Sequence, residues 1–108
     1  MSNEVLNNIV DDIVKRVNPT KVILFGSTAR GETNKDSDLD LLIIEKEKFN
    51  KDRSRRKELK SIRQLLMKYK IPKDILLYDE EEVEYWKDSS NHIISRCLKE
   101  GKTLYEKN

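Results

Sequence analysis

Apolar residues recur at the spacing of an α-helix in two long segments of the chain. Near the N-terminus they fall on one face of an amphipathic helix, which Ser2 or Asn3 can cap and which Asn18-Pro19 ends. A second such pattern, at residues 51–69, predicts a longer helix with a basic exposed face. Ile71-Pro72 follows this pattern, and because proline cannot continue a helix, the helix is expected to end there.

Three short, continuous apolar runs predict buried β-strands. They are KVILF at residues 21–25, LDLLII at residues 39–44 and KDILLY at residues 73–78. The first two are expected to pair side by side, and residues 103–105 can add a last short strand. Because helices alternate with these strands, the predicted fold class is α/β (α+β), a small mixed sheet of three to four strands backed by helices.

The C-terminal part of the chain predicts two further helices. An acidic turn at residues 79–84 begins a short helix around Trp86. Ser89 or Ser90 is the expected N-cap of the last helix, and Gly101 is its expected C-terminal stop. Both helices are expected to pack against the sheet.

Length and composition limit the chain to one modest domain. Residues 1–108 are expected to form a single domain with a thin core, because only 36% of the residues are hydrophobic and 39% are charged. The net charge of +2 argues against a dedicated nucleic-acid-binding surface, so no direct binding of nucleic acid is expected.

Three features bear on the cellular context. Cys97 is the single cysteine, which excludes an internal disulfide and a cysteine-rich metal site and favours a role in core packing. No apolar run approaches the roughly 20 residues that span a membrane. The N-terminus has acidic and amide residues where a signal peptide has basic ones. We therefore expect a soluble cytoplasmic protein without membrane contact.

The segment FGSTARGETNKDSDLDLLII, residues 25–44, carries the strongest chemical signal. Gly26 and Ser27 follow the first predicted strand at a turn that can hold an anion, and ten residues later Asp38 and Asp40 open the second strand. Side chains two positions apart on a strand share a face, so these two carboxylates are expected to lie together. Such a pair attracts hard divalent cations such as Mg²⁺. The combination suggests phosphoryl or nucleotidyl transfer, although each half alone is common in turns and at solvated strand ends.

This segment resembles the G-S-x10-D-x-D signature of the DNA polymerase β-like nucleotidyltransferase superfamily. In its wider form it is similar to the minimal nucleotidyltransferases, the MNT or MntA-type antitoxins that pair with HEPN toxins. The motif covers about a fifth of the chain, and the order of the other predicted elements also fits that family. The resemblance implies a polymerase β-like nucleotidyltransferase fold.

The resemblance also implies roles for individual residues. Gly26 and Ser27 would bind the phosphates of ATP, and two Mg²⁺ ions would be held by Asp38, Asp40 and Asp74, with Asp74 also helping to activate the acceptor oxygen. The alternative for Ser27 is an ordinary helix N-cap, and for Asp74 a strand-entry aspartate exposed to water. Arg30 can steady a phosphate or pair with a loop carboxylate, and the sequence favours neither.

Relatives of this type transfer AMP from ATP to a tyrosine of a HEPN-domain RNase, forming a type VII toxin–antitoxin pair. The resemblance therefore implies a Mg-dependent protein adenylyltransferase whose partner is a HEPN toxin. One alternative is a binding module that neutralises its partner by occlusion. Another is a nucleotidyltransferase that modifies a small molecule such as an antibiotic, but the chain lacks the appended helical domain that larger relatives use to hold an acceptor.

The predicted helix at residues 51–69 raises a separate question of partner binding. Residues 51–70 contain nine basic and two acidic residues, a face that can attract a triphosphate, an acidic protein or RNA. If this face is an interface, Arg53, Arg55 and Arg56 are expected to contribute to binding. The alternative is an ordinary solvated helix face.

Overall fold

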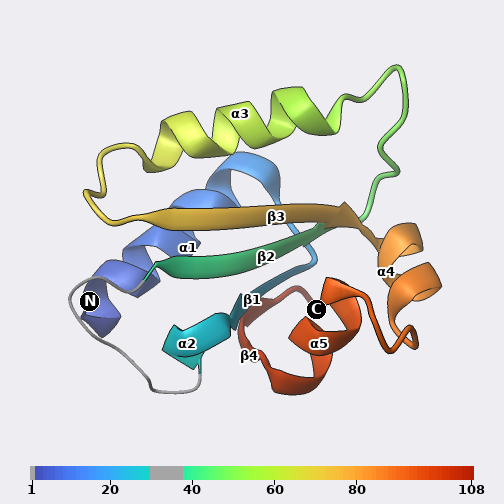
Figure 1. The fold of residues 1–108 in the computed structure, drawn as a ribbon. Coiled ribbons are helices and arrows are strands. Elements are labelled where there is room, and N and C mark those ends of the chain that lie inside the picture. Colours follow the sequence, from blue (N-terminus) through green and yellow to red (C-terminus); the bar gives the residue numbers. More distant parts are fainter. Residues whose placement is uncertain (1, 30–37) are drawn as a thin grey trace.

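The computed structural model describes residues 2–29 and 38–108. Figure 1 shows the elements in these two segments. In chain order they are α1 (Asn3–Val17), β1 (Lys21–Phe25), α2 (Gly26–Ala29), β2 (Leu39–Glu45), α3 (Arg55–Leu66), β3 (Lys73–Asp79), α4 (Glu80–Trp86), α5 (Ile93–Glu100) and β4 (Lys102–Glu106).

The four strands form one mixed sheet in the order β3-β2-β1-β4. Strand β1 is antiparallel to both β2 and β4, whereas β2 and β3 run parallel. Helix α3 lies on the connection between the two parallel strands, which cannot be joined by a tight turn. The predictions of a small mixed sheet backed by helices, and of a pairing between the first two strands, are confirmed.

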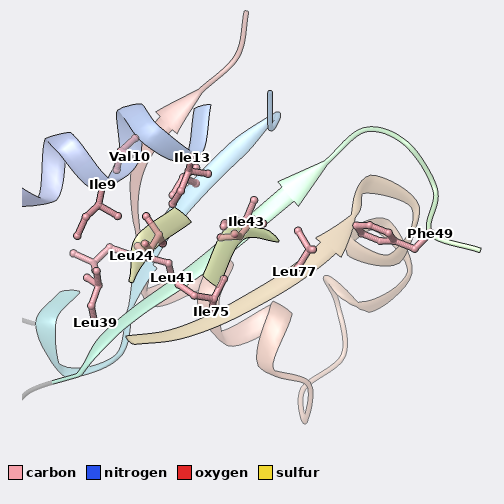
Figure 2. Close-up of a cluster of buried hydrophobic side chains, with 13 residues drawn as sticks. Ile9, Val10, Ile13, Leu24, Leu39, Leu41, Ile43, Phe49, Ile75 and Leu77 are labelled. Carbon is pink, nitrogen blue, oxygen red and sulfur yellow. The ribbon is translucent and has the colours of Figure 1, made fainter. Parts of the chain in front are cut away.

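The alternation of side chains along the strands gives the sheet two packed faces. Helices α1 and α3 cover one face, where Leu39, Leu41 and Ile43 of β2 join the larger core (Figure 2). The opposite face packs under α4 and α5, with a smaller cluster that includes Leu42 and the single cysteine, Cys97. Strand β2 is thus buried on both faces, which explains its nearly continuous apolar sequence. The buried position of Cys97 confirms its predicted place in the core.

Both ends of α1 agree with the sequence pattern. The Ser2 hydroxyl accepts a hydrogen bond from the backbone N–H of Val5 at 3.2 Å, and Asn18 ends the helix in the left-handed conformation with φ of 49°. No helix in residues 2–29 and 38–108 has the length and apolar character needed to cross a membrane.

Helix α3 is shorter than predicted. It begins at Arg55 rather than at residue 51 and ends at Leu66 rather than at residue 69. Residues 50–53 form a turn in which the Asn50 side chain accepts hydrogen bonds from the backbone N–H groups of Asp52 and Arg53, at 2.8 and 3.0 Å. Ser54 then caps the helix. Side-chain hydrogen bonds to the local backbone compete with the helix here, which the apolar periodicity does not reveal.

The N-cap of α5 is His92, so the prediction of Ser89 or Ser90 is wrong. Residue Ser89 belongs to the turn that follows α4, where its N–H donates to the carbonyl oxygen of Trp86 at 3.0 Å. His92 Nδ1 accepts a hydrogen bond from the N–H of Ile94 at 3.1 Å. Its ring stacks on the indole of Trp86, with a centroid distance of 4.2 Å. This stacking places His92, rather than a serine, at the start of the helix.

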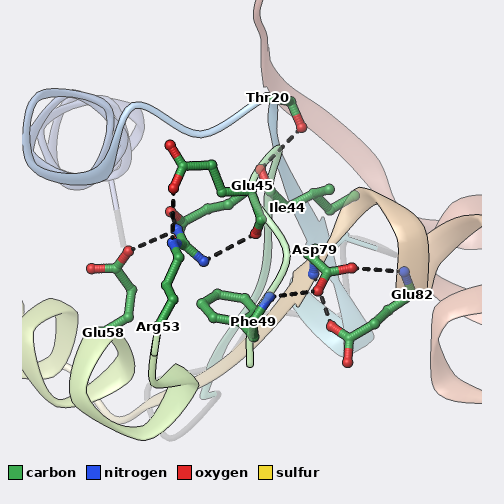
Figure 3. A network of polar contacts seen from close by, with 9 residues as sticks. Thr20, Ile44, Glu45, Phe49, Arg53, Glu58, Asp79 and Glu82 are labelled. Atoms are coloured by element: carbon green, nitrogen blue, oxygen red, sulfur yellow. Dashed lines mark hydrogen bonds and ion pairs between the residues drawn. The ribbon is translucent and has the colours of Figure 1, made fainter. Parts of the chain in front are cut away.

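Arg53 joins the end of β2 to α3 through three carboxylates (Figure 3). Its Nη2 atom lies 2.6 Å from the Oε1 of Glu45 and 3.2 Å from the Oε2 of Glu58, while its Nε atom lies 3.4 Å from Glu47. Glu45 is only 3% exposed. Arg53 therefore links the buried acid at the end of β2 to helix α3.

Arg55 also serves the fold, because it pairs with Glu82 of α4 and donates a hydrogen bond to the carbonyl oxygen of Leu77 at 3.3 Å. Reversing the charges of Arg53 and Arg55 would therefore disrupt the structure and cannot test for an interface. Of the three arginines named for that purpose, Arg56 is the one that lies on the exposed surface.

Glu45 is a buried acid at this junction, and its pKa is raised. Burial raises the pKa of Glu45 to about 7, aided by its hydrogen bond to Glu58 and by the charge of Glu58, while Arg53 opposes the shift. Its Oε2 atom is buried and has no hydrogen-bond partner among the described residues. The protonated form therefore fits this site better than the carboxylate does.

Replacing Glu45 should flatten the dependence of stability on pH. An ordinary glutamate has a pKa of 4.5, so the folded protein holds the Glu45 proton more tightly than the unfolded chain does. Its contribution to the free energy of unfolding is complete below about pH 4.5 and is lost as the pH rises through about 7. In Glu45→Gln, urea unfolding should show a smaller loss of stability between those values. Glu47→Gln, an exposed neighbour on the same arginine, is the control; equal pH slopes in wild type and Glu45→Gln would contradict the assignment.

Candidate active site

Asp40 and Asp74 lie directly opposite each other on neighbouring strands. They are register partners in the parallel pairing of β2 and β3. Neighbouring strands lie about 4.8 Å apart, and partners in register project to the same face of the sheet. Two carboxylates separated by 34 positions in the sequence therefore share one patch at the N-terminal end of both strands.

The chain fixes this register at the entrance to the two strands. The backbone N–H of Leu39 donates to the carbonyl oxygen of Pro72 at 2.8 Å, just before the two aspartates. The ammonium group of Lys73 donates to the carbonyl oxygens of Tyr69 and Ile71, at 2.6 and 2.7 Å, and so ties the end of the α3–β3 connection to the strand. A slip of one residue would turn Asp74 to the other face and bury it.

Gly26 completes the patch from β1. It follows Phe25, the antiparallel partner of Asp40, and has a φ of 76°, which side chains rarely allow. A Cβ atom built on Gly26 would overlap the carboxylate of Asp40. Only glycine therefore allows the turn after β1 and the carboxylate of β2 to approach so closely.

The structure describes the other predicted site residues only in part. Asp38 is exposed and lies one residue before β2, close enough to act on Asp40. The backbone of Ser27 lies in the short helix α2, directly after Gly26. Arg30 lies outside the described residues. The roles proposed for Ser27 and Arg30 remain predictions.

The carboxylate of Asp40 is repelled by two neighbouring carboxylates, those of Asp74 and Asp38. Partial burial raises the pKa of this carboxyl group, and the charges of Asp74 and Asp38 raise it further. Each of these causes, all from the described part of the chain, opposes the ionisation of Asp40. A cation placed among these carboxylates would relieve that repulsion.

The donors present fit a hard divalent cation such as Mg²⁺, because all three are carboxylates. Among residues 2–29 and 38–108, however, no three acidic, histidine or cysteine side chains are already arranged to hold a metal ion. Asp38, Asp40 and Asp74 would have to turn toward one another for all three to bind one ion. The backbone thus brings Asp40 and Asp74 together, and a metal site here stays a prediction.

Sequence reasoning did not find that α5 reaches this patch. Arg96, Cys97 and Glu100 of α5 line a small cavity together with Phe25 and Gly26. The sequence predicted a core position for Cys97, but no local pattern places α5 beside the end of β1. That contact depends on how the C-terminal segment folds back over the sheet.

Comparison with known proteins finds a matching family and a relative of this chain. The sequence profile of the nucleotidyltransferase domain family matches residues 6–101. The chain is 30% identical over 114 aligned positions to a Methanocaldococcus jannaschii protein named "Putative protein adenylyltransferase MJ1305", and the alignment covers 99% of this chain and 76% of that protein.

Two solved structures have the same fold at low sequence identity. A "putative nucleotidyltransferase" from Sulfolobus solfataricus superposes with a TM-score of 0.64 at 20% identity, covering 96% of this chain and 79% of that one. A toxin–antitoxin structure with AMP-PNP superposes with a TM-score of 0.55 at 18% identity, covering 94% of this chain and 73% of that one. These likenesses confirm the predicted fold.

Gly26→Ala should destabilise the protein by about 1–3 kcal/mol, because alanine is strained at a positive φ and its Cβ overlaps the Asp40 carboxylate. Urea unfolding measures the loss. The double variant Gly26→Ala/Asp40→Ala removes the overlap but keeps the backbone strain, so its loss should be smaller than the sum of the two single losses. Strict additivity would show that Gly26 and Asp40 do not contact each other.

Mg²⁺ should raise the thermal unfolding midpoint of the wild-type protein. At about ten times its dissociation constant the ion adds about 1.4 kcal/mol, or roughly 5–10 °C for a domain of this size. Asp40→Asn should lose most of this shift, and in metal-free buffer it should unfold no lower than wild type because repulsion with Asp74 is relieved. Asp88→Asn, an exposed control outside the patch, should retain the shift. A full shift in Asp40→Asn would exclude this carboxylate as a ligand.

Proposed function

This chain belongs to the nucleotidyltransferase domain family, and we propose that it transfers AMP from ATP to a tyrosine hydroxyl of a partner protein. The observation that carries the proposal is the register pairing of Asp40 with Asp74 beside Gly26. Burial and mutual repulsion make this arrangement costly to the folded protein. The metal-binding site of a nucleotidyltransferase would explain why the fold keeps these repelling carboxylates together.

The carboxylates of Asp38, Asp40 and Asp74 would hold Mg²⁺, with two ions expected. Bound there, Mg²⁺ supplies positive charge to the triphosphate and lowers the pKa of the acceptor hydroxyl. The proposal requires only hard oxygen ligands, which these three residues provide.

The remaining residues would position the substrates. The Gly26 backbone would approach the phosphates at the turn after β1, and the backbone and hydroxyl of Ser27 would donate hydrogen bonds to the β- and γ-phosphates. Asp74 would orient the acceptor hydroxyl and accept its proton. The acceptor oxygen then bonds to the α-phosphorus, the bond from that phosphorus to the bridging oxygen breaks, and pyrophosphate leaves. Catalysis of this kind depends on positioning and charge.

The proposed acceptor is a tyrosine of a HEPN-domain RNase toxin, which would make this chain the antitoxin of the pair. Two findings support a protein acceptor: a relative carries the name of a protein adenylyltransferase, and a toxin–antitoxin structure shares the fold. Adenylation would add bulk and negative charge to the toxin, and near an RNA-binding groove that charge repels RNA.

Two alternatives remain open. The chain could neutralise its partner by occlusion, without catalysis; the paired carboxylates argue against this, because a steric inhibitor gains nothing from their repulsion. It could instead modify a small molecule such as an antibiotic. The name of the relative and the toxin–antitoxin neighbour favour a protein acceptor over a small molecule.

Asp74→Asn should abolish transfer while preserving the fold, because asparagine has nearly the same shape but neither the charge nor the basicity. The assay combines α-labelled ATP, Mg²⁺ and the HEPN-domain partner and measures the label on that partner. Transfer should fall at least about a hundredfold. Asp88→Asn, an exposed substitution of the same kind, should transfer label at the wild-type rate.

The same variants separate catalysis from occlusion. If Asp74→Asn and Asp40→Asn neutralise the toxin fully while transferring no label, occlusion explains neutralisation and the catalytic proposal fails. Robust transfer by Asp74→Asn would instead place the third carboxylate elsewhere in the chain.

A further inference from the structure

A cavity of about 170 Å³ lies between the end of β1 and helix α5. It is lined by Phe25, Gly26, Ile93, Arg96, Cys97 and Glu100. Two observations place it beside the carboxylate patch. Phe25 is the register partner of Asp40, and Gly26 contributes both to the cavity and to the close approach to Asp40. A ligand whose phosphates lie at Gly26 can therefore extend into it.

The inner walls of the cavity are apolar. Phe25 and Ile93 pack against the smaller core cluster, and Cys97 belongs to it. Burial is the main cause that raises the pKa of the Cys97 thiol to about 11, with smaller contributions from the charges of Asp40 and Glu100 and an opposing one from Arg96. The thiol is therefore neutral at physiological pH and serves as an apolar wall rather than as a nucleophile.

Two side chains of opposite charge border the cavity and are not paired with each other. Arg96 and Glu100 are one turn apart on α5, and both are exposed. Within the part of the chain that the structure describes, neither side chain forms a hydrogen bond or an ion pair. A guanidinium group with no partner among the described residues is available to a ligand.

We propose that this cavity receives the nucleobase of the nucleoside triphosphate, with the guanidinium plane of Arg96 stacked on the base; the inference rests on the proposed function. The volume is below the roughly 300 Å³ of pockets that enclose a whole small ligand, so it suits one ring system. Apolar walls favour a base over a phosphate, and the Glu100 carboxylate would repel a phosphate. Arginine planes commonly stack on bases.

Binding of two probes separates the base from the phosphates. Calorimetry with Mg²⁺ measures the affinities for a non-cleavable ATP analogue and for inorganic tripolyphosphate. Arg96→Ala should bind the ATP analogue about fivefold to tenfold more weakly, the range expected for losing one cation–π contact, and should bind tripolyphosphate within about twofold of wild type. Lys99→Ala removes a positive charge from an exposed position on the same helix and should change neither affinity.

Arg96→Lys keeps the charge and removes the planar group, so it should resemble Arg96→Ala if the contact is stacking. Equal losses for both probes in Arg96→Ala would make Arg96 a phosphate ligand, and unchanged affinities would leave the cavity without a role; either result overturns the inference. If the wild-type protein binds neither probe, the proposed function itself fails. An unchanged thermal unfolding midpoint confirms that Arg96→Ala is folded.

Discussion

The parallel pairing of β2 with β3 is the constraint on which the candidate site depends. It sets Asp40 against Asp74 although 34 positions separate them in the chain. The same pairing buries the leucines and isoleucines that follow both aspartates, so hydrophobic burial holds together two charges that repel each other. The apolar part of each strand thereby stabilises the acidic end.

The acidic side chains at the two ends of β2 have different surroundings. At its C-terminal end, Glu45 accepts a hydrogen bond from Arg53 (Figure 3). Arg53 lowers the pKa of Glu45, whereas burial and Glu58 raise it. At its N-terminal end, the causes that the described residues supply all raise the pKa of the Asp40 carboxyl group. Among the described residues, Arg53 is a cation paired with Glu45, and Asp40 has no such ion pair. This difference fits a structural role for the Glu45 end and the proposed cation site at the Asp40 end.

Sequence reasoning predicted the strands well and the helix ends less well. The apolar runs gave β1 with its bounds and β2 and β3 to within one residue. The signal is most continuous in β2, which is buried on both faces. The starts of α3 and α5 were wrong, because they depend on the Asn50 turn and on the stacking of His92 on Trp86. Neither contact changes the apolar periodicity on which the predictions relied.

The sequence by itself determined the order of the elements and the motif from Gly26 to Asp40, because both depend on residues close together in the chain. Only the tertiary structure decided that Asp74 faces Asp40, that Gly26 has no room for a side chain, and that α5 brings Arg96 to the end of β1. These contacts join distant segments. Their geometry follows from strand register and from burial across the whole sheet, which no local pattern contains.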